Sequence, residues 1–198
     1  MSPRTRRLAA PIAAFLFGLV ALGTAAYVTL APEMPRRQAS AAIGGPFTLV
    51  DGEGRTVTQK DFQGTPFLVF FGFTHCPDIC PTKLAELSEV FAKLGRKGEK
   101  VRALFVTVDP ERDTPAIMKS YVSSFDDRIV GLTGDRAEID KVIKAYRVFA
   151  RKVPLKDGDY TMEHTGLVYL MNKDGLFAGS LNLDGPPERA AKEIAREL

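Results

Sequence analysis

Apolar residues along the chain recur with two different spacings, which predict strands and helices in alternation. Short runs rich in β-branched and aromatic residues predict strands over residues 47–50, 55–58, 66–73, 101–108, 128–132, 166–171 and 176–179. Apolar residues three and four positions apart predict helices over residues 84–94, 115–124, 135–149 and 186–198. Segment 66–73 is apolar along its whole length, which is typical of a strand buried on both faces.

Turn-forming residues separate these elements in a consistent way. Residues 51–54 and 172–175 each divide two predicted strands, so we expect two hairpins. Thr114 and Pro115 suit the N-cap and the first position of a helix. Parallel crossovers in this order predict an α/β fold, a mixed sheet with antiparallel edges flanked by helices. The stretch 152–159 is expected to be a polar loop.

The N-terminal part of the chain has a different character from the rest. Residues 8–32 contain no charged side chain, and as a helix they are long enough to span a hydrocarbon core of about 30 Å. Arginines at positions 4, 6 and 7 precede this stretch, which favours a cytoplasmic N-terminus. The stretch exceeds the usual apolar core of a cleaved signal peptide. We therefore expect an uncleaved transmembrane anchor over residues 1–31.

A short segment rich in proline, glycine and small residues follows this anchor. We interpret residues 32–45 as a flexible tether and residues 46–198 as a single folded domain. An Ala39–Ala41 signature is also compatible with cleavage, and either interpretation places the domain outside the cytoplasm. The expected location is the bacterial cytoplasmic membrane, crossed once, with the domain in the periplasm.

Composition and charge narrow the classes of function. Of the 198 residues, 45% are hydrophobic and 26% are charged, a balance typical of a globular domain. The net charge of +3 comes from the N-terminal segment, because the first 38 residues contain five arginines and one glutamate. The remaining chain is close to neutral and offers no basic surface for a nucleic acid.

The two cysteines of the chain, Cys76 and Cys80, are its most informative residues. Two cysteines exclude both a disulfide-stapled mini-protein and a four-cysteine zinc site. They follow the predicted buried strand and lead into a helix, as the thiols of a thioredoxin-like fold do. Four helical positions would place both sulfurs on one face, at a helix N-terminus that favours thiolate. A thiolate is both a soft metal ligand and a redox nucleophile. The alternative, that both cysteines are free residues of the core, is disfavoured because flanking prolines and a strand-to-helix loop are not typical of a core position.

Three motifs together resemble the SCO/SenC family, whose members are membrane-anchored thioredoxin-fold proteins that handle copper for cytochrome oxidase. The motifs are Phe71–Pro81, Val106–Pro115 and Asp159–Gly166. The resemblance covers about residues 43–198 and implies that Cys76, Cys80 and His164 bind copper. The chain departs from the family pattern at Glu163, where many relatives carry aspartate before the histidine.

The residues themselves agree with this ligand set. His164 precedes the predicted strand 166–171, in the loop where thioredoxins carry a cis-proline that faces the thiols. The chain has no proline between Pro154 and Pro186, so this position is open to a histidine ligand. Two thiolates and one imidazole suit Cu(I), and a further group or water would complete a shell for Cu(II). Zinc would usually require a fourth protein ligand.

Several nearby residues have two possible roles. Asp109 follows a predicted strand and either orients the site or caps a local turn. Arg112 and Asp113 are interpreted as a local pair that leads into a helix. His75 is expected to be an exposed loop residue, and Asp78 a carboxylate near a helix start.

Two functions compete. In the first, the protein is a copper metallochaperone that binds one copper ion and helps to assemble the dinuclear copper centre of cytochrome c oxidase. In the second, it is a thiol-disulfide reductase that keeps the cysteines of that centre reduced. The expected partners are the copper-bearing oxidase subunit and a further periplasmic copper chaperone or thiol reductant. Peroxide reduction is disfavoured, because Phe73 stands where peroxiredoxins have threonine.

Overall fold

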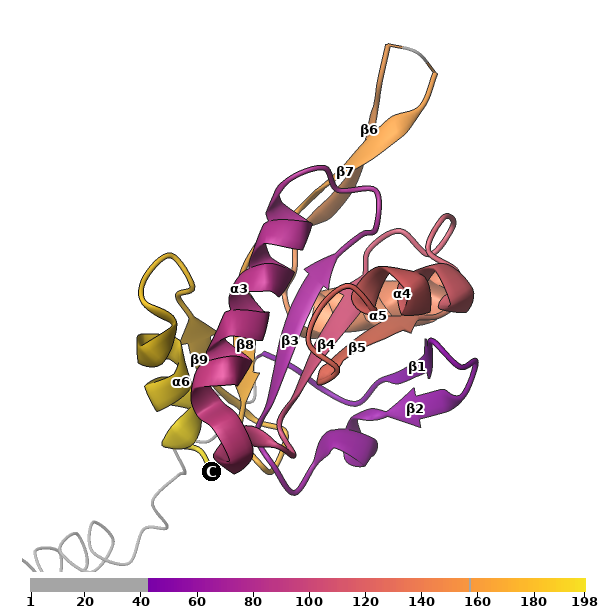
Figure 1. The fold of residues 1–198 in the computed structure, drawn as a ribbon. Helices are drawn as coiled ribbons and strands as arrows, with labels where there is room; N and C mark the ends of the chain where they lie inside the picture. Colours follow the sequence, from indigo (N-terminus) through magenta and orange to yellow (C-terminus); the bar gives the residue numbers. More distant parts are fainter. Residues whose placement is uncertain (1–42, 157) are drawn as a thin grey trace, which may run out of the picture. The chain divides into compact units, whose positions relative to one another are not determined.

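A computed structural model describes residues 43–156 and 158–198 (Figure 1). The predicted anchor, residues 1–31, and the first part of the predicted tether lie outside these described residues. Within them, Gly44 already contacts the domain, because its N–H donates to the Ala145 carbonyl at 2.9 Å. No helix in the described ranges is long and apolar enough to cross a membrane.

A seven-stranded mixed sheet forms the centre of the domain, as the order of the predicted elements indicates. In spatial order its strands are β2 (Thr56–Thr58), β1 (Thr48–Asp51), β5 (Ile129–Thr133), β4 (Arg102–Thr107), β3 (Phe67–Gly72), β8 (Val168–Met171) and β9 (Phe177–Leu181). Strands β3, β4 and β5 are parallel, and the other neighbours are antiparallel. The three parallel strands therefore end at one edge, where ligands bind in α/β proteins.

Helices cover both faces of this sheet, with two short 3-10 turns at Gln59–Phe62 (η1) and Gly95–Gly98 (η2). One face packs against α3 (Ile79–Leu94), α4 (Pro115–Val122) and α6 (Pro187–Ala195), and the other against α5 (Arg136–Ala145). Alternate residues of β3 fill the two cores: Leu68 and Phe70 face the first layer, and Val69 and Phe71 the second. The predicted strand buried on both faces is thus confirmed.

The largest difference from the prediction is a further hairpin between α5 and β8, in addition to the two predicted hairpins β1–β2 and β8–β9. Residues 152–154, predicted as part of a polar loop, belong to β6 (Ala150–Pro154), and residues 160–164, for which no element was predicted, form β7 (Tyr160–His164). The two strands pair as a separate two-stranded sheet. The α5 helix stops at Ala145, and Arg147 then takes a positive φ of 54° that turns the chain out of it. Figure 1 shows this hairpin extending beyond the end of β3 and the start of α3.

A glycine at the end of β3 permits the close contact of the sheet with α3. A Cβ atom on Gly72 would lie 2.6 Å from the Cys80 sulfur and 2.6 Å from the ring of Phe105. Both neighbours are fully buried, so neither has room to retreat. The absence of a side chain at position 72 therefore determines how deeply Cys80 can sit against the strand.

We predict that Gly72→Ala destabilises the domain by about 1–3 kcal/mol, because the added methyl group overpacks the contact with Cys80 and Phe105. The free energy of unfolding in denaturant measures the loss. Gly179→Ala is the matched control, since Gly179 also lies in a strand and its Cβ would meet nothing within 4 Å. Equal stability of the two variants would show that position 72 tolerates a side chain.

Candidate metal centre

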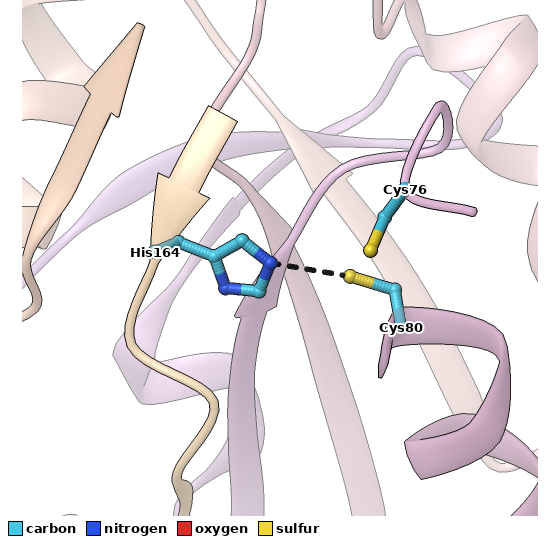
Figure 2. Close-up of side chains that lie close together, drawn as sticks. All are labelled: Cys76, Cys80 and His164. Atoms are coloured by element: carbon cyan, nitrogen blue, oxygen red, sulfur yellow. Dashed lines mark hydrogen bonds between the residues drawn. The ribbon is translucent and has the colours of Figure 1, made fainter. Parts of the chain in front are cut away.

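Cys76, Cys80 and His164 meet at the carboxyl end of β3 (Figure 2). One donor atom from each residue lies within 4.8 Å of the other two. Cys76 lies in the loop after β3, Cys80 is the second residue of α3, and His164 is the last residue of β7. In the ranges that the structure describes, this is the only group of three or more histidine, cysteine or acidic side chains close enough to share a metal ion.

The cysteines are brought together by a loop and not by a helical repeat. The helix begins at Ile79, so Cys76 precedes it, and the prediction that both cysteines share one helix face is wrong. The Cys76 N–H donates instead to the carbonyl of Phe73 at 3.2 Å, which turns the chain back toward the helix start. Asp78 occupies the N-cap position, as expected near a helix start, but its side chain makes no capping hydrogen bond.

The two thiols differ in their exposure. Cys80 is fully buried, whereas Cys76 is partly exposed, and neither forms a disulfide. Burial raises the pKa of the Cys80 thiol far above its usual value, and the nearby Cys76 and Asp113 add to the effect. For Cys80, desolvation therefore outweighs the benefit expected from a helix N-terminus. Cys76 is the sulfur that a partner protein can reach.

His164 offers its Nε2 atom to the cysteines. Its Nδ1–H donates to the Thr165 carbonyl at 3.1 Å, which leaves Nε2 without a proton, and Cys80 donates its S–H to Nε2 at 3.5 Å. Burial lowers the pKa of His164, which favours the neutral imidazole. The rings of Phe73 and Phe70 pack at 5.8 and 6.3 Å from the imidazole and fix its plane.

A buried carboxylate holds the loop that carries Cys76. Asp113 is fully buried and accepts hydrogen bonds from the Thr74 hydroxyl at 2.6 Å, the Thr74 N–H at 3.1 Å and the Thr107 hydroxyl at 2.5 Å. The interpretation of Arg112 and Asp113 as a local pair is therefore wrong. Arg112 pairs with Asp109 instead, at 2.5 Å.

Sequence reasoning missed the role of Asp113 because Thr74, its partner in the cysteine loop, lies 39 positions away along the chain. The only available signal was its place in the motif Val106–Pro115, directly before the cap of α4. Of the two roles left open for Asp109, the structure favours contact with the surroundings of the site. Its buried carboxylate accepts from Arg112 and from the hydroxyl of Tyr160 at 3.0 Å, and the local turn is closed by its backbone carbonyl.

His75 and the two methionines nearest to His164 in the sequence lie outside the donor cluster. His75 is exposed, as expected, and its Nδ1 is 3.1 Å from the Thr74 hydroxyl. Met162 packs partly buried against the core on the α5 side of the sheet, and Met171 is fully buried there. The donor set of the cluster is therefore two sulfurs and one nitrogen. Such a set suits a soft ion such as Cu(I), and the same two sulfurs can instead form a disulfide.

Comparisons with known proteins point to one family. The family model described as SCO1/SenC matches residues 35–198. The chain is 41% identical over 162 residues to the mitochondrial SCO2 homolog of Bos taurus, a match that covers 80% of this chain and 61% of that protein. This chain thus spans less than two thirds of that relative's length.

Solved structures agree with this assignment. The structure of Bradyrhizobium japonicum ScoI with copper bound is 59% identical, with a TM-score of 0.76, and the match covers 79% of this chain and all of that one. BsSco, in which a disulfide switch was identified, is described as a member of the Sco family of cytochrome c oxidase assembly proteins. It is 25% identical with a TM-score of 0.62, over 79% of this chain and 94% of its own. The thioredoxin-like mixed sheet, the paired cysteines and these matches show that the chain belongs to the SCO1/SenC family.

Proposed function

We propose that this protein is a copper metallochaperone that binds one copper ion through Cys76, Cys80 and His164 and helps to assemble the dinuclear copper centre of cytochrome c oxidase. The observation that carries the proposal is the placement of the three donor atoms within 4.8 Å of one another. Support comes from the copper bound to ScoI and from the description of the Sco family as oxidase assembly proteins.

The geometry suits a cargo that must be held and then released. Two thiolates and one neutral imidazole satisfy Cu(I) without a fourth ligand, and a water or another group completes the shell of Cu(II). Because Cys76 is partly exposed, a docked partner can replace it first by ligand exchange. Cys80 and His164, which lie deeper, then release the ion in turn. In this role the protein transfers a metal and catalyses no reaction.

The partners follow from this chemistry. The acceptor is the copper-bearing subunit of cytochrome c oxidase, and the donor is another periplasmic copper chaperone. A thiol reductant is also required, because a compartment outside the cytoplasm oxidises cysteine pairs. We further propose that residues 1–31 anchor the protein in the bacterial cytoplasmic membrane, that residues 32–45 tether the domain, and that the domain faces the periplasm. No nucleic acid is among the partners.

A second function, reduction of the oxidase cysteines, is favoured by the unequal exposure of the two thiols. Cys76 can attack a target disulfide, forming a mixed disulfide and releasing one target thiolate. Cys80 then attacks the Cys76 sulfur, which releases the second target thiolate and leaves a Cys76–Cys80 disulfide. Two protein thiols are thereby oxidised as one target disulfide is reduced. This cycle requires both cysteines and does not require His164.

We predict that His164→Ala lowers the affinity for copper by about tenfold or more, because one of three donor atoms is lost. Anaerobic titration of the reduced full chain with Cu(I) and Cu(II), against a competing chelator, measures the change. Disulfide exchange by the metal-free protein should continue at nearly the wild-type rate.

His75→Ala is the matched control for this experiment. The chain has two histidines, and His75 lies next to Cys76 but outside the donor cluster. Copper affinity should be unchanged in the control. Equal loss of affinity in both variants, or loss of copper binding and disulfide exchange together in a folded His164→Ala protein, would contradict the proposed division of roles.

The order of attack in the second function gives a separate prediction. Cys80→Ser should accumulate a mixed disulfide with a small disulfide probe, because Cys76 remains able to attack and no thiol is left to resolve the product. Cys76→Ser should react much more slowly, since burial raises the pKa of Cys80 and depletes its thiolate. Mass spectrometry of the quenched reaction distinguishes the two adducts, and equal trapping by both variants would refute this order.

The proposed anchor is tested by fractionation of cells. The full chain should remain with membranes after carbonate extraction, and a variant that retains an export signal but lacks residues 1–31 should move to the periplasmic fraction. An alkaline phosphatase fusion after residue 198 reports on which side of the membrane the domain lies. Release of the full chain by carbonate would rule out the anchor.

A further inference from the structure

The backbone of His164 belongs to the β6–β7 hairpin and not to the central sheet. His164 ends a hairpin that forms its own two-stranded sheet, and hydrogen bonding to the central sheet resumes only at Val168. The cysteines, by contrast, are attached directly to β3 and α3. Other interactions must therefore set the distance between the imidazole and the sulfurs.

Arg112 provides such an interaction with β7. Its Nη1 donates to the carbonyl of Tyr160 at 3.0 Å, and its guanidinium carbon lies 3.8 Å from the centre of the Tyr160 ring. Asp109 completes the contact, because its carboxylate accepts from Arg112 at 2.5 Å and from the Tyr160 hydroxyl at 3.0 Å. The first residue of the strand that ends in His164 is thus held by two side chains of one turn.

The Arg112 guanidinium also lies near the Phe73 ring, which packs against the imidazole of His164. It lies 5.9 Å from the centre of the Phe73 ring, and that ring packs edge-on at 5.8 Å from the imidazole of His164. Only 18% of the Arg112 side chain is exposed, and its Nη2 is buried without a hydrogen-bond partner among the described residues. Burying a charged group in this way costs free energy that an exposed arginine would not lose.

Asp113, the residue after Arg112, contacts the loop that carries Cys76. Asp113 accepts from Thr74 in the loop that leads to Cys76. Arg112 and Asp113 belong to one tight turn. Their N–H groups both donate to the Asp109 carbonyl, at 3.2 and 3.0 Å. A single turn therefore contacts both ligand-bearing segments, which are far apart in the sequence.

We propose that the Asp109–Asp113 turn sets the separation of the metal ligands, with Arg112 as the positioning residue for His164 and Asp113 as the positioning residue for the cysteine loop. This proposal builds on the proposed copper site and adds residues that touch no metal. It has a specific consequence: Arg112 acts on copper only through His164, whereas Asp113 acts through the cysteines.

The test compares Arg112→Gln with Arg128→Gln in the full chain, purified in detergent. Arg128 is a close match, because its side chain is also 18% exposed, also pairs with an aspartate and also lies over an aromatic ring, that of Phe91. Arg112→Gln should weaken copper binding about 10- to 100-fold, the usual effect of losing a group that orients a ligand. Arg128→Gln should bind copper like the wild type.

Two further readouts separate positioning from general destabilisation. Combining Arg112→Gln with His164→Ala should weaken copper binding no more than His164→Ala alone, because the two changes remove the same interaction. In the metal-free protein, the NMR signals of the His164 imidazole should shift in Arg112→Gln and stay unmoved in Arg128→Gln. If Arg112→Gln fails to fold, Tyr160→Phe replaces it, because this variant loses only the hydroxyl contact with Asp109. Tyr160→Phe should show a smaller loss of copper affinity and a smaller shift of the His164 signals.

Each outcome decides one of the two proposals. Equal copper affinity and unmoved His164 signals in Arg112→Gln and Arg128→Gln overturn the positioning role and leave the copper site intact. Additive losses in the double variant also overturn it, since Arg112 would then act apart from His164. Absence of His164-dependent copper binding in the wild type refutes the proposed function, and the metal-free NMR comparison still tests the positioning role.

Discussion

Asp113 links the carboxyl ends of the three parallel strands through its buried carboxylate and its backbone carbonyl. Its oxygens accept hydrogen bonds from Thr74 after β3 and Thr107 at the end of β4, and its backbone carbonyl accepts one from Thr133 at the end of β5. A carboxylate removed from water requires such partners, because an unsatisfied buried charge strongly destabilises the folded state. Since Thr74 follows β3 and Thr107 ends β4, satisfying this carboxylate also fixes the base of the loop that carries Cys76.

The two proposed functions, copper transfer and disulfide reduction, would use the same atoms and would exclude each other at any one moment. A Cys76–Cys80 disulfide leaves no thiolate for copper, and a copper ion bound by both sulfurs leaves no thiol for exchange. His164 would distinguish the two states, because its Nε2, which accepts a hydrogen bond from Cys80 in the metal-free protein, would be a ligand only in the copper-bound state. In an oxidising compartment, the supply of reductant would therefore decide how much of the protein can carry copper.

The sequence predicted those parts of the fold whose pattern is imposed by burial. The central strand β3 and the apolar face of α3 were found because their side chains fill the two cores. The β6–β7 hairpin was missed because none of its strand residues is fully buried, so no alternation of apolar and polar residues marks it. The partners of Asp113 and Arg112 were missed for another reason. Thr74 lies 39 positions from Asp113, and Tyr160 lies 48 positions from Arg112.

Glu163 shows how the hairpin separates the ligand from its neighbour in the sequence. Successive side chains of a strand point to opposite faces, so Glu163 faces away from the side on which His164 meets the cysteines. Its exposed carboxylate pairs with Arg151 at 2.7 Å, directly across the hairpin. The side chain at position 163 therefore makes a contact within the hairpin. The ligand geometry is insulated from it, because the contacts of His164 are made on the opposite face, with Cys80 and the rings of Phe70 and Phe73.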